Sequence, residues 1–186
     1  MAYFNTRDIV AIVMCAVLWA VLNNTISPIF WQMTHMPFLC DFLAFTSLIL
    51  VAWWTRKFGA VSLTGLIVTI LTFALRGGTH MLGFMAASIL FDILTRTIGY
   101  NNCFENPLPS TISIISFSTI CAGAAGIIIG SIFMNLNPIW AVITFAATHA
   151  VGGIIGGIFG LVIVNALKIR ITIPSHSRQA ARSNLS

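Results

Sequence analysis

Long apolar runs separated by short polar connections are the feature that most restricts how this chain can fold. Of its 186 residues, 58% are hydrophobic and only 7% are charged, and the mean hydropathy is +0.98. A soluble domain of this length cannot bury so much apolar surface. The runs lack the alternation of membrane-barrel strands, so helices are the structure that satisfies their backbone hydrogen bonds in lipid. The sequence therefore predicts an all-α integral membrane protein.

A hydropathy window of about 19 residues predicts six membrane-spanning helices. Each is long enough to cross a hydrocarbon core of about 30 Å. The connections are too short for a soluble domain, so we expect a six-helix membrane domain over residues 1–170 and a basic tail over 171–186. No A-x-A cleavage site follows the first run, which we therefore interpret as a span rather than a signal peptide. The predicted spans are Ile9–Ile26, Phe38–Trp54, Gly59–Leu75, Met81–Ile98, Thr111–Phe133 and Ile139–Leu167.

Positive charge is concentrated in the connections on one side of the predicted membrane. If the N-terminus is cytoplasmic, Arg76 is the one outer cation among the nine lysines and arginines. This bias predicts that both termini are cytoplasmic, and the net charge of +5 is a topology signal rather than a nucleic-acid footprint. The basic tail either lies against anionic headgroups or is solvated. The inner cations are Arg7, Arg56, Lys57, Arg96, Lys168, Arg170, Arg178 and Arg182.

Small residues recur at helical spacing in the last two predicted spans. Such ladders let helix backbones approach closely, so we expect them to pack inside the bundle. Ala16 and Ala20 form a similar pair in the first span. The ladders consist of Gly152, Gly156 and Gly160, with Gly153 and Gly157 beside them, and of Ala122, Gly126 and Gly130.

Polar and aromatic residues gather in the three outer connections and at the helix ends beside them. Aromatic walls with a few placed polar groups are what capture of a small, partly polar molecule requires. Trp31 and Trp140 also fit the aromatic belt at a membrane interface. The predicted substrate-binding residues are Trp31, Gln32, His35, Arg76, His80, Phe84, Asn135 and Trp140.

Arg76 and the following residues carry the most specific part of this prediction. Arg76 departs from the charge bias, which leaves two alternatives: it binds an anion, or it pairs with Asp41 at the outer start of the second span. His80, Phe84 and Ser88 share one face of the fourth span, which lines either a pocket or the core.

We expect the remaining ionisable and reactive residues to have structural roles. Asp92 and Arg96 are one turn apart, so we expect a local ion pair. His149 shares a face with Gly152 and Gly156, so we expect it at a close helix contact rather than at a ligand. The four cysteines lack metal-ligand spacing and are interpreted as apolar packing residues, so no metal site is predicted. Motifs of hydrolases, zinc proteases and P-loop ATPases are absent from the sequence, so we expect no enzyme and no cofactor.

The chain resembles the substrate-binding S component of energy-coupling factor (ECF) transporters over residues 4–170. The resemblance rests on length and topology, on Ala16 and Ala20, on a long, weakly hydrophobic first outer loop over Thr25–Pro37, and on the segment His149-Ala150-Val151-Gly152-Gly153.

This resemblance implies a prokaryotic plasma-membrane protein that captures a vitamin-like molecule from outside. It also implies partners: a transmembrane coupling protein, which would contact Ala16 and Ala20, and two ATP-binding-cassette subunits that use ATP. Metal-binding members have a histidine-rich N-terminus, whereas the first histidine here is His35, which disfavours nickel and cobalt. The aromatic walls and Arg76 favour an aromatic or heterocyclic substrate, with a carboxylate or phosphate as options.

Two alternatives come from other functional classes. One is a self-sufficient oligomeric channel or facilitator for small solutes, with the glycine-rich fifth and sixth spans as the subunit interface. The other is a scaffold subunit of a membrane complex, whose outer loops bind protein.

Overall fold

The chain forms a bundle of helices in the computed structural model, which describes residues 3–34, 36–105 and 107–183, with side chains described except for 107 and 171–183. Five of the described helical segments are long and apolar enough to cross a membrane, and α3 is a shorter apolar helix. The elements are α1 (Thr6–Thr34), α2 (Phe38–Thr55), α3 (Ala60–Arg76), α4 (Met81–Ile98), α5 (Tyr100–Phe104), α6 (Pro107–Ile128), the π-helix η1 (Ile129–Phe133) and α7 (Ile139–Ser183).

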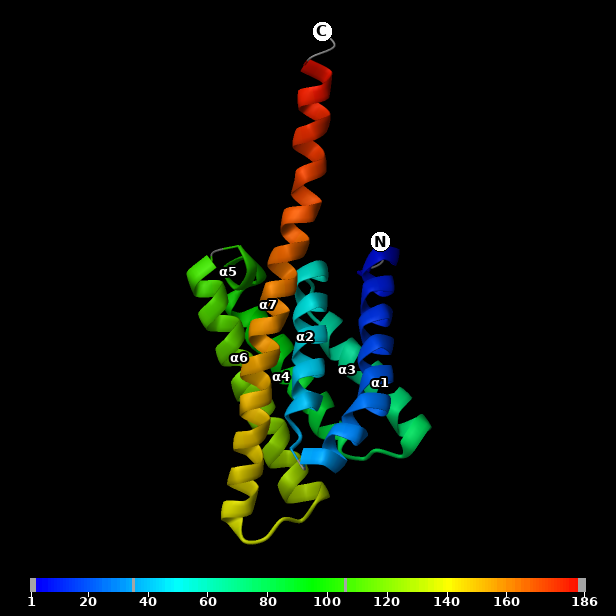
Figure 1. Cartoon of the computed structure of the whole chain (residues 1–186), viewed down its shortest axis with the longest axis vertical. Coiled ribbons are helices and arrows are strands. Elements are labelled where there is room, and N and C mark those ends of the chain that lie inside the picture. Colours follow the sequence, from blue (N-terminus) through cyan, green and yellow to red (C-terminus); the bar gives the residue numbers. More distant parts are fainter. Residues whose placement is uncertain (1–2, 35, 106, 184–186) are drawn as a thin grey trace.

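The long helices form a closed ring in the order α1, α3, α4, α6, α7 and α2, in which each contacts the next and α2 returns to α1. α2 also contacts α3 and α4, and it is the most buried of the long helices. Both chain ends lie toward the same end of the bundle, and α7 projects beyond the other helices there (Figure 1). The interior between the helices is filled by large side chains, among them Trp19, Phe45 and Phe91, each at most 1% exposed.

Two predicted boundaries were wrong. Most of the segment predicted as the first outer loop is helical, because α1 continues through Pro28 to Thr34. α7 continues as a helix to Ser183, beyond Leu167, where the predicted span ends. The short helix α5 was not predicted, since five residues carry too little periodicity to reveal a helix.

The glycine ladders pack inside the bundle, as predicted. A Cβ at Gly152 would lie 2.6 Å from the Phe38 carbonyl oxygen on α2, and a Cβ at Gly153 would lie 2.5 Å from the Ser118 carbonyl oxygen on α6. α7 thus uses one glycine face against α2 and the neighbouring face against α6, because only glycine allows backbones to come this close.

Ala16 and Ala20 also lie inside the bundle, at 0% and 1% exposed. The face of α1 that carries them is turned toward the rest of the bundle, where α1 contacts α2 and α3. The prediction that these alanines form a docking face for a partner is therefore corrected, since the chain's own helices cover them.

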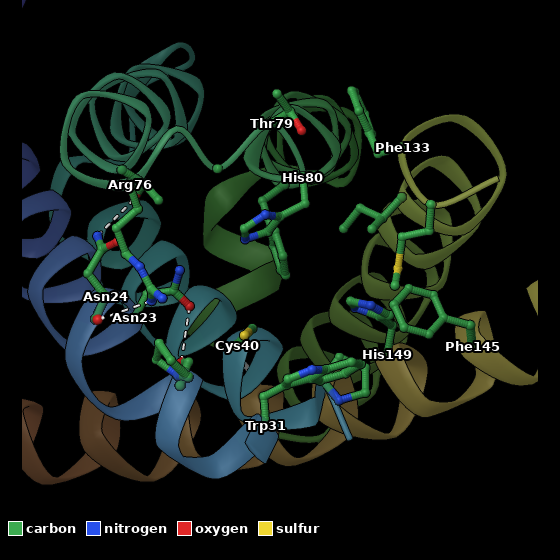
Figure 2. A pocket seen from close by; sticks show the side chains of 18 of the residues that line it. Asn23, Asn24, Trp31, Cys40, Arg76, Thr79, His80, Phe133, Phe145 and His149 are labelled. Atoms are coloured by element: carbon green, nitrogen blue, oxygen red, sulfur yellow. Dashed lines mark hydrogen bonds between the residues drawn. The ribbon is translucent and has the colours of Figure 1, made fainter. Parts of the chain in front are cut away.

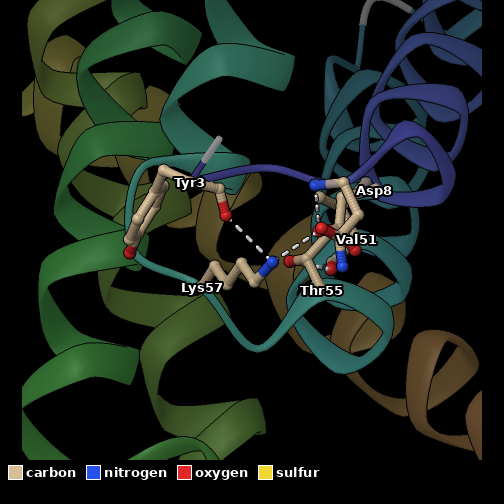
Figure 3. A network of polar contacts seen from close by, with 6 residues as sticks. Tyr3, Asp8, Val51, Thr55 and Lys57 are labelled. Carbon is tan, nitrogen blue, oxygen red and sulfur yellow. Dashed lines mark hydrogen bonds and ion pairs between the residues drawn. The ribbon is translucent and has the colours of Figure 1, made fainter. Parts of the chain in front are cut away.

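Ion pairs and a helix-capping carboxylate connect the helices at the end of the bundle that carries the termini. Lys57 Nζ lies 2.7 Å from Asp8 Oδ2 and also donates to the Tyr3 carbonyl oxygen (Figure 3). Arg56 pairs with Glu105 at 2.6 Å, which ties the α2–α3 connection to α5.

Asp92 has a different role from the one predicted. Its Oδ2 accepts hydrogen bonds from the Gly59 and Ser62 backbone N–H groups and from the Ser62 hydroxyl, at 2.8–3.0 Å. The carboxylate on α4 therefore caps the N-terminus of α3, where the helix leaves backbone donors unpaired. The expected pair with Arg96 is absent from the described ion pairs.

Candidate functional site

A cavity of about 580 Å³ lies between the helices (Figure 2). The helix ends and connections that line it are at the end of the bundle remote from the termini (Figure 1). The cavity walls come from α1, the start of α2, the end of α3, the α3–α4 connection, the start of α4, η1 and α7. The volume is in the range of pockets that hold small organic molecules. The polar lining consists of Asn23, Asn24, Ser27, Gln32, Cys40, Thr72, Arg76, Thr79, His80 and His149, and the apolar lining of Pro28, Trp31, Pro37, Phe84, Ile129, Phe133, Met134 and Phe145, with Gly78 completing it.

Pro28 explains why α1 carries part of this lining. Proline has no N–H, so the carbonyl of Asn24, four residues earlier, loses its helical partner. Arg76 Nη1 donates to this carbonyl oxygen at 3.3 Å. The C-terminal residue of α3 thus satisfies the acceptor released by a proline in α1, and this contact holds the guanidinium at the cavity wall.

The two asparagines beside Pro28 form a hydrogen-bonded lining. Asn24 Nδ2 donates to the Ala20 carbonyl oxygen at 2.7 Å and to Thr72 Oγ1 at 3.2 Å. Asn23 Oδ1 accepts from the Ser27 hydroxyl at 3.1 Å. Asn24 Oδ1 is buried and has no hydrogen-bond partner among the described residues, so it is an acceptor available to a bound molecule.

His80 lies at the α3–α4 connection, where Gly77 adopts a positive φ of 65° that favours glycine. Burial lowers the pKa of His80 below 6.5, and the positive charge of Arg76 and an electrostatic contribution from His149 lower it further. These effects favour the neutral imidazole, which can both donate and accept a hydrogen bond.

His149 was expected at a helix contact and not at a ligand; it lies at a contact with α2 and also lines the cavity. Its Nδ1 lies 2.7 Å from Asp41 Oδ2 on α2, and the two side chains are 2% and 0% exposed. Despite this short distance, the carboxylate oxygens of Asp41 and both ring nitrogens of His149 have no hydrogen-bond partner of good geometry among the described residues. His149 Nε2, the ring nitrogen that is not beside Asp41, is one of these atoms. The ring packs against Phe145 with centroids 4.7 Å apart and against Phe84 at 5.9 Å.

This arrangement corrects one alternative for Arg76. Asp41 was considered as its partner, but Asp41 is beside His149, and the described hydrogen bond of Arg76 goes to the Asn24 carbonyl. Local sequence patterns could not reveal the contact between Asp41 and His149, because the two residues are more than a hundred positions apart.

The π-helix η1 supplies Ile129 and Phe133 to the cavity wall. A π-helical turn costs backbone stability and is found most often beside functional sites. Here η1 follows directly on α6. The wider π-helical turn changes which side chains at the end of this span point toward the cavity.

The structure brings together five of the eight predicted substrate-binding residues. Trp31, Gln32, Arg76, His80 and Phe84 line the cavity. Asn135 and Trp140 do not; both are exposed in the η1–α7 region, Trp140 at 64%. His35 lies outside the described residues.

The face of α4 that carries His80, Phe84 and Ser88 was predicted to line either a pocket or the core, and it does both. His80 and Phe84 line the cavity, whereas Ser88 is fully buried and packs against Gly65 of α3. Of the cysteines, Cys103 and Cys121 are buried packing residues, but Cys40 lines the cavity. Among the described residues there is no cluster of His, Cys, Asp and Glu that could hold a metal ion.

Comparison of the chain with protein-family models, with curated proteins and with solved structures gives no significant match.

Proposed function

We propose that this protein is a membrane-embedded substrate-binding subunit that captures a small molecule in the cavity between α1, α4 and α7. The observation that carries the proposal is the cavity itself: about 580 Å³, with aromatic walls and a few placed polar groups, at one end of a helical bundle. Buried polar atoms without partners, Asn24 Oδ1 and His149 Nε2, are what a bound molecule would satisfy.

The interior below the cavity supports binding rather than free passage. The fully buried rings of Trp19, Phe45 and Phe91 occupy the bundle on the side of the termini. A bound molecule would need a rearrangement of helices to reach the other side of the membrane. The glycine ladders, which a self-sufficient oligomeric channel would use as its subunit interface, are already occupied by contacts within the chain.

The proposed topology has six spans with both termini in the cytoplasm of a prokaryotic cell. α3 is the sixth span: its 17 residues reach about 26 Å at 1.5 Å per residue, near the thickness of the hydrocarbon core. The charge bias places the end of the bundle with Arg56 and Lys57 inside, so the cavity faces outward.

The proposed partners are those of an ECF-type importer, by the resemblance of the sequence. A transmembrane coupling protein and two ATP-binding-cassette subunits would supply the energy, and this chain would carry its substrate unchanged. Since Ala16 and Ala20 are buried, the coupling protein would contact another surface of the chain.

Native mass spectrometry of the detergent-purified protein, with identification of small molecules released on denaturation, tests the binding role. We expect one compound per chain in the wild type, and loss of that compound when Trp31, which lines the cavity, is changed to alanine. Trp140→Ala is the matched control, because Trp140 lies outside the cavity and its loss should leave the compound bound.

An empty wild-type protein, or equal retention by Trp31→Ala and the control, would remove the binding role. The facilitator or scaffold roles would then be tested by solute flux in liposomes and by capture of membrane partners.

A further inference from the structure

The acidic residues of the chain leave the cation at the cavity unmatched. The sequence has four acids, and each is engaged elsewhere in the structure. Asp8 pairs with Lys57, Glu105 pairs with Arg56, Asp92 caps α3 and Asp41 lies beside His149. Among the described residues no carboxylate is paired with Arg76, so its remaining donors are available to an anionic group of a bound molecule.

Arg76 is prepared to receive such an anion. One of its five N–H donors contacts the Asn24 carbonyl, which fixes the guanidinium at the cavity wall and leaves donors for a second group. Arg76 is the arginine among the residues that line the cavity, and its guanidinium brings a positive charge to this wall.

The opposite wall is suited to a flat ring. Figure 2 shows Arg76, Asn23 and Asn24 on one side of the cavity and His149, Phe145 and Phe133 on the other, with Trp31 near the latter group. Aromatic side chains hold rings by stacking or edge contacts. His149 adds one polar atom, Nε2, that is buried with its residue at 2% exposed and has no partner among the described residues.

We infer that the cavity binds a flat aromatic or heteroaromatic compound with an anionic substituent, whose ring lies between Trp31 and Phe145 and hydrogen-bonds to His149, and whose carboxylate or phosphate contacts Arg76. This inference rests on the proposed binding function and adds the charge and shape of the substrate.

Two pairs of probes that differ only in charge test it: nicotinate with nicotinamide, and indole-3-acetate with indole-3-acetamide. Saturation-transfer NMR measures their binding to the full chain in maltoside detergent. We expect the acid of at least one pair to bind at least about tenfold more tightly than its amide, because a charge-assisted hydrogen bond contributes about 1.5–3 kcal/mol. Arg76→Gln should abolish the preference, and Arg96→Gln, an exposed cation remote from the cavity, should preserve it.

An isosteric charge change gives a second, independent test. Asn24→Asp places a carboxylate beside Arg76 without changing side-chain size, so it should abolish the acid preference while the fold is retained. Asn102→Asp, at an exposed position of α5, is the control and should bind as the wild type does.

Amides that bind as tightly as their acids, binding of none of the four probes, or a preference that survives Arg76→Gln would each overturn the inference. Equal probe binding together with loss of co-purified phospholipid in Arg76→Gln would show that Arg76 holds a lipid phosphate instead. The binding role fails differently, through a wild-type protein that retains no compound; a retained compound that is neutral or cationic refutes only the inference about its charge.

Discussion

At the scale of single residues, Asp41 and His149 form a buried contact between two ionisable side chains. A carboxylate that is 0% exposed within a membrane span loses its hydration, and the described structure offers it one neighbour of opposite potential charge, His149 at 2.7 Å. Such a pair adds little net stability against apolar residues of the same shape, but breaking it leaves an unpaired polar group in a dry interior. The pair also fixes the His149 ring at the cavity wall.

Replacement of one partner should therefore cost more than replacement of both. We expect His149→Phe to destabilise the fold by about 3 kcal/mol, because Asp41 is left buried without a partner. The double variant Asp41→Leu with His149→Phe should recover most of this loss. Thermal unfolding in detergent measures both, and a double variant less stable than the single one would contradict this account of the pair.

At the scale of helices, departures from regular structure create the cavity. Pro28 releases the Asn24 carbonyl in α1, η1 replaces the last α-helical turn after α6, and the α3–α4 connection turns at Gly77. Elsewhere the helices are regular, and α7 packs closely along its two glycine faces. These three irregular segments all line the cavity, where lipid does not have to solvate their backbone.

Close packing of α7 predicts a sharp difference between two glycines. Gly152→Ala should destabilise the protein by about 1–3 kcal/mol, because the new methyl group would lie 2.6 Å from the Phe38 carbonyl oxygen. Gly123→Ala is the control: its nearest neighbour would be Ala150 Cβ at 3.9 Å, and alanine favours the helix. Equal melting temperatures for the two variants would argue against close α2–α7 packing.

At the scale of the whole molecule, the two ends of the bundle differ in chemistry. The end with the termini is fastened by ion pairs from Lys57 and Arg56 and by the Asp92 cap, whereas the opposite end is open and holds the cavity. An open cavity at one end and a packed opposite end are consistent with the proposed capture of a small molecule from one side of a membrane.

The proposed orientation predicts which end reacts with an impermeant reagent. In a variant without native cysteines, Thr79→Cys should react with a membrane-impermeant maleimide in intact cells, because Thr79 is exposed beside the cavity. Asn102→Cys, exposed on α5 at the other end, should react only after permeabilisation. The reverse pattern would show that the cavity faces the cytoplasm.

The sequence by itself determined the helical spans, because hydropathy acts locally: α4 was predicted at its observed bounds, and α2 and α3 to within one residue. The internal packing of the glycine ladders also followed from local spacing. The tertiary structure alone decided that Ala16 and Ala20 are buried, that Asp41 contacts His149, and that Arg76 reaches the carbonyl released by Pro28. These contacts join residues distant in the chain, and helical periodicity defines the faces of each helix but not which neighbour covers them.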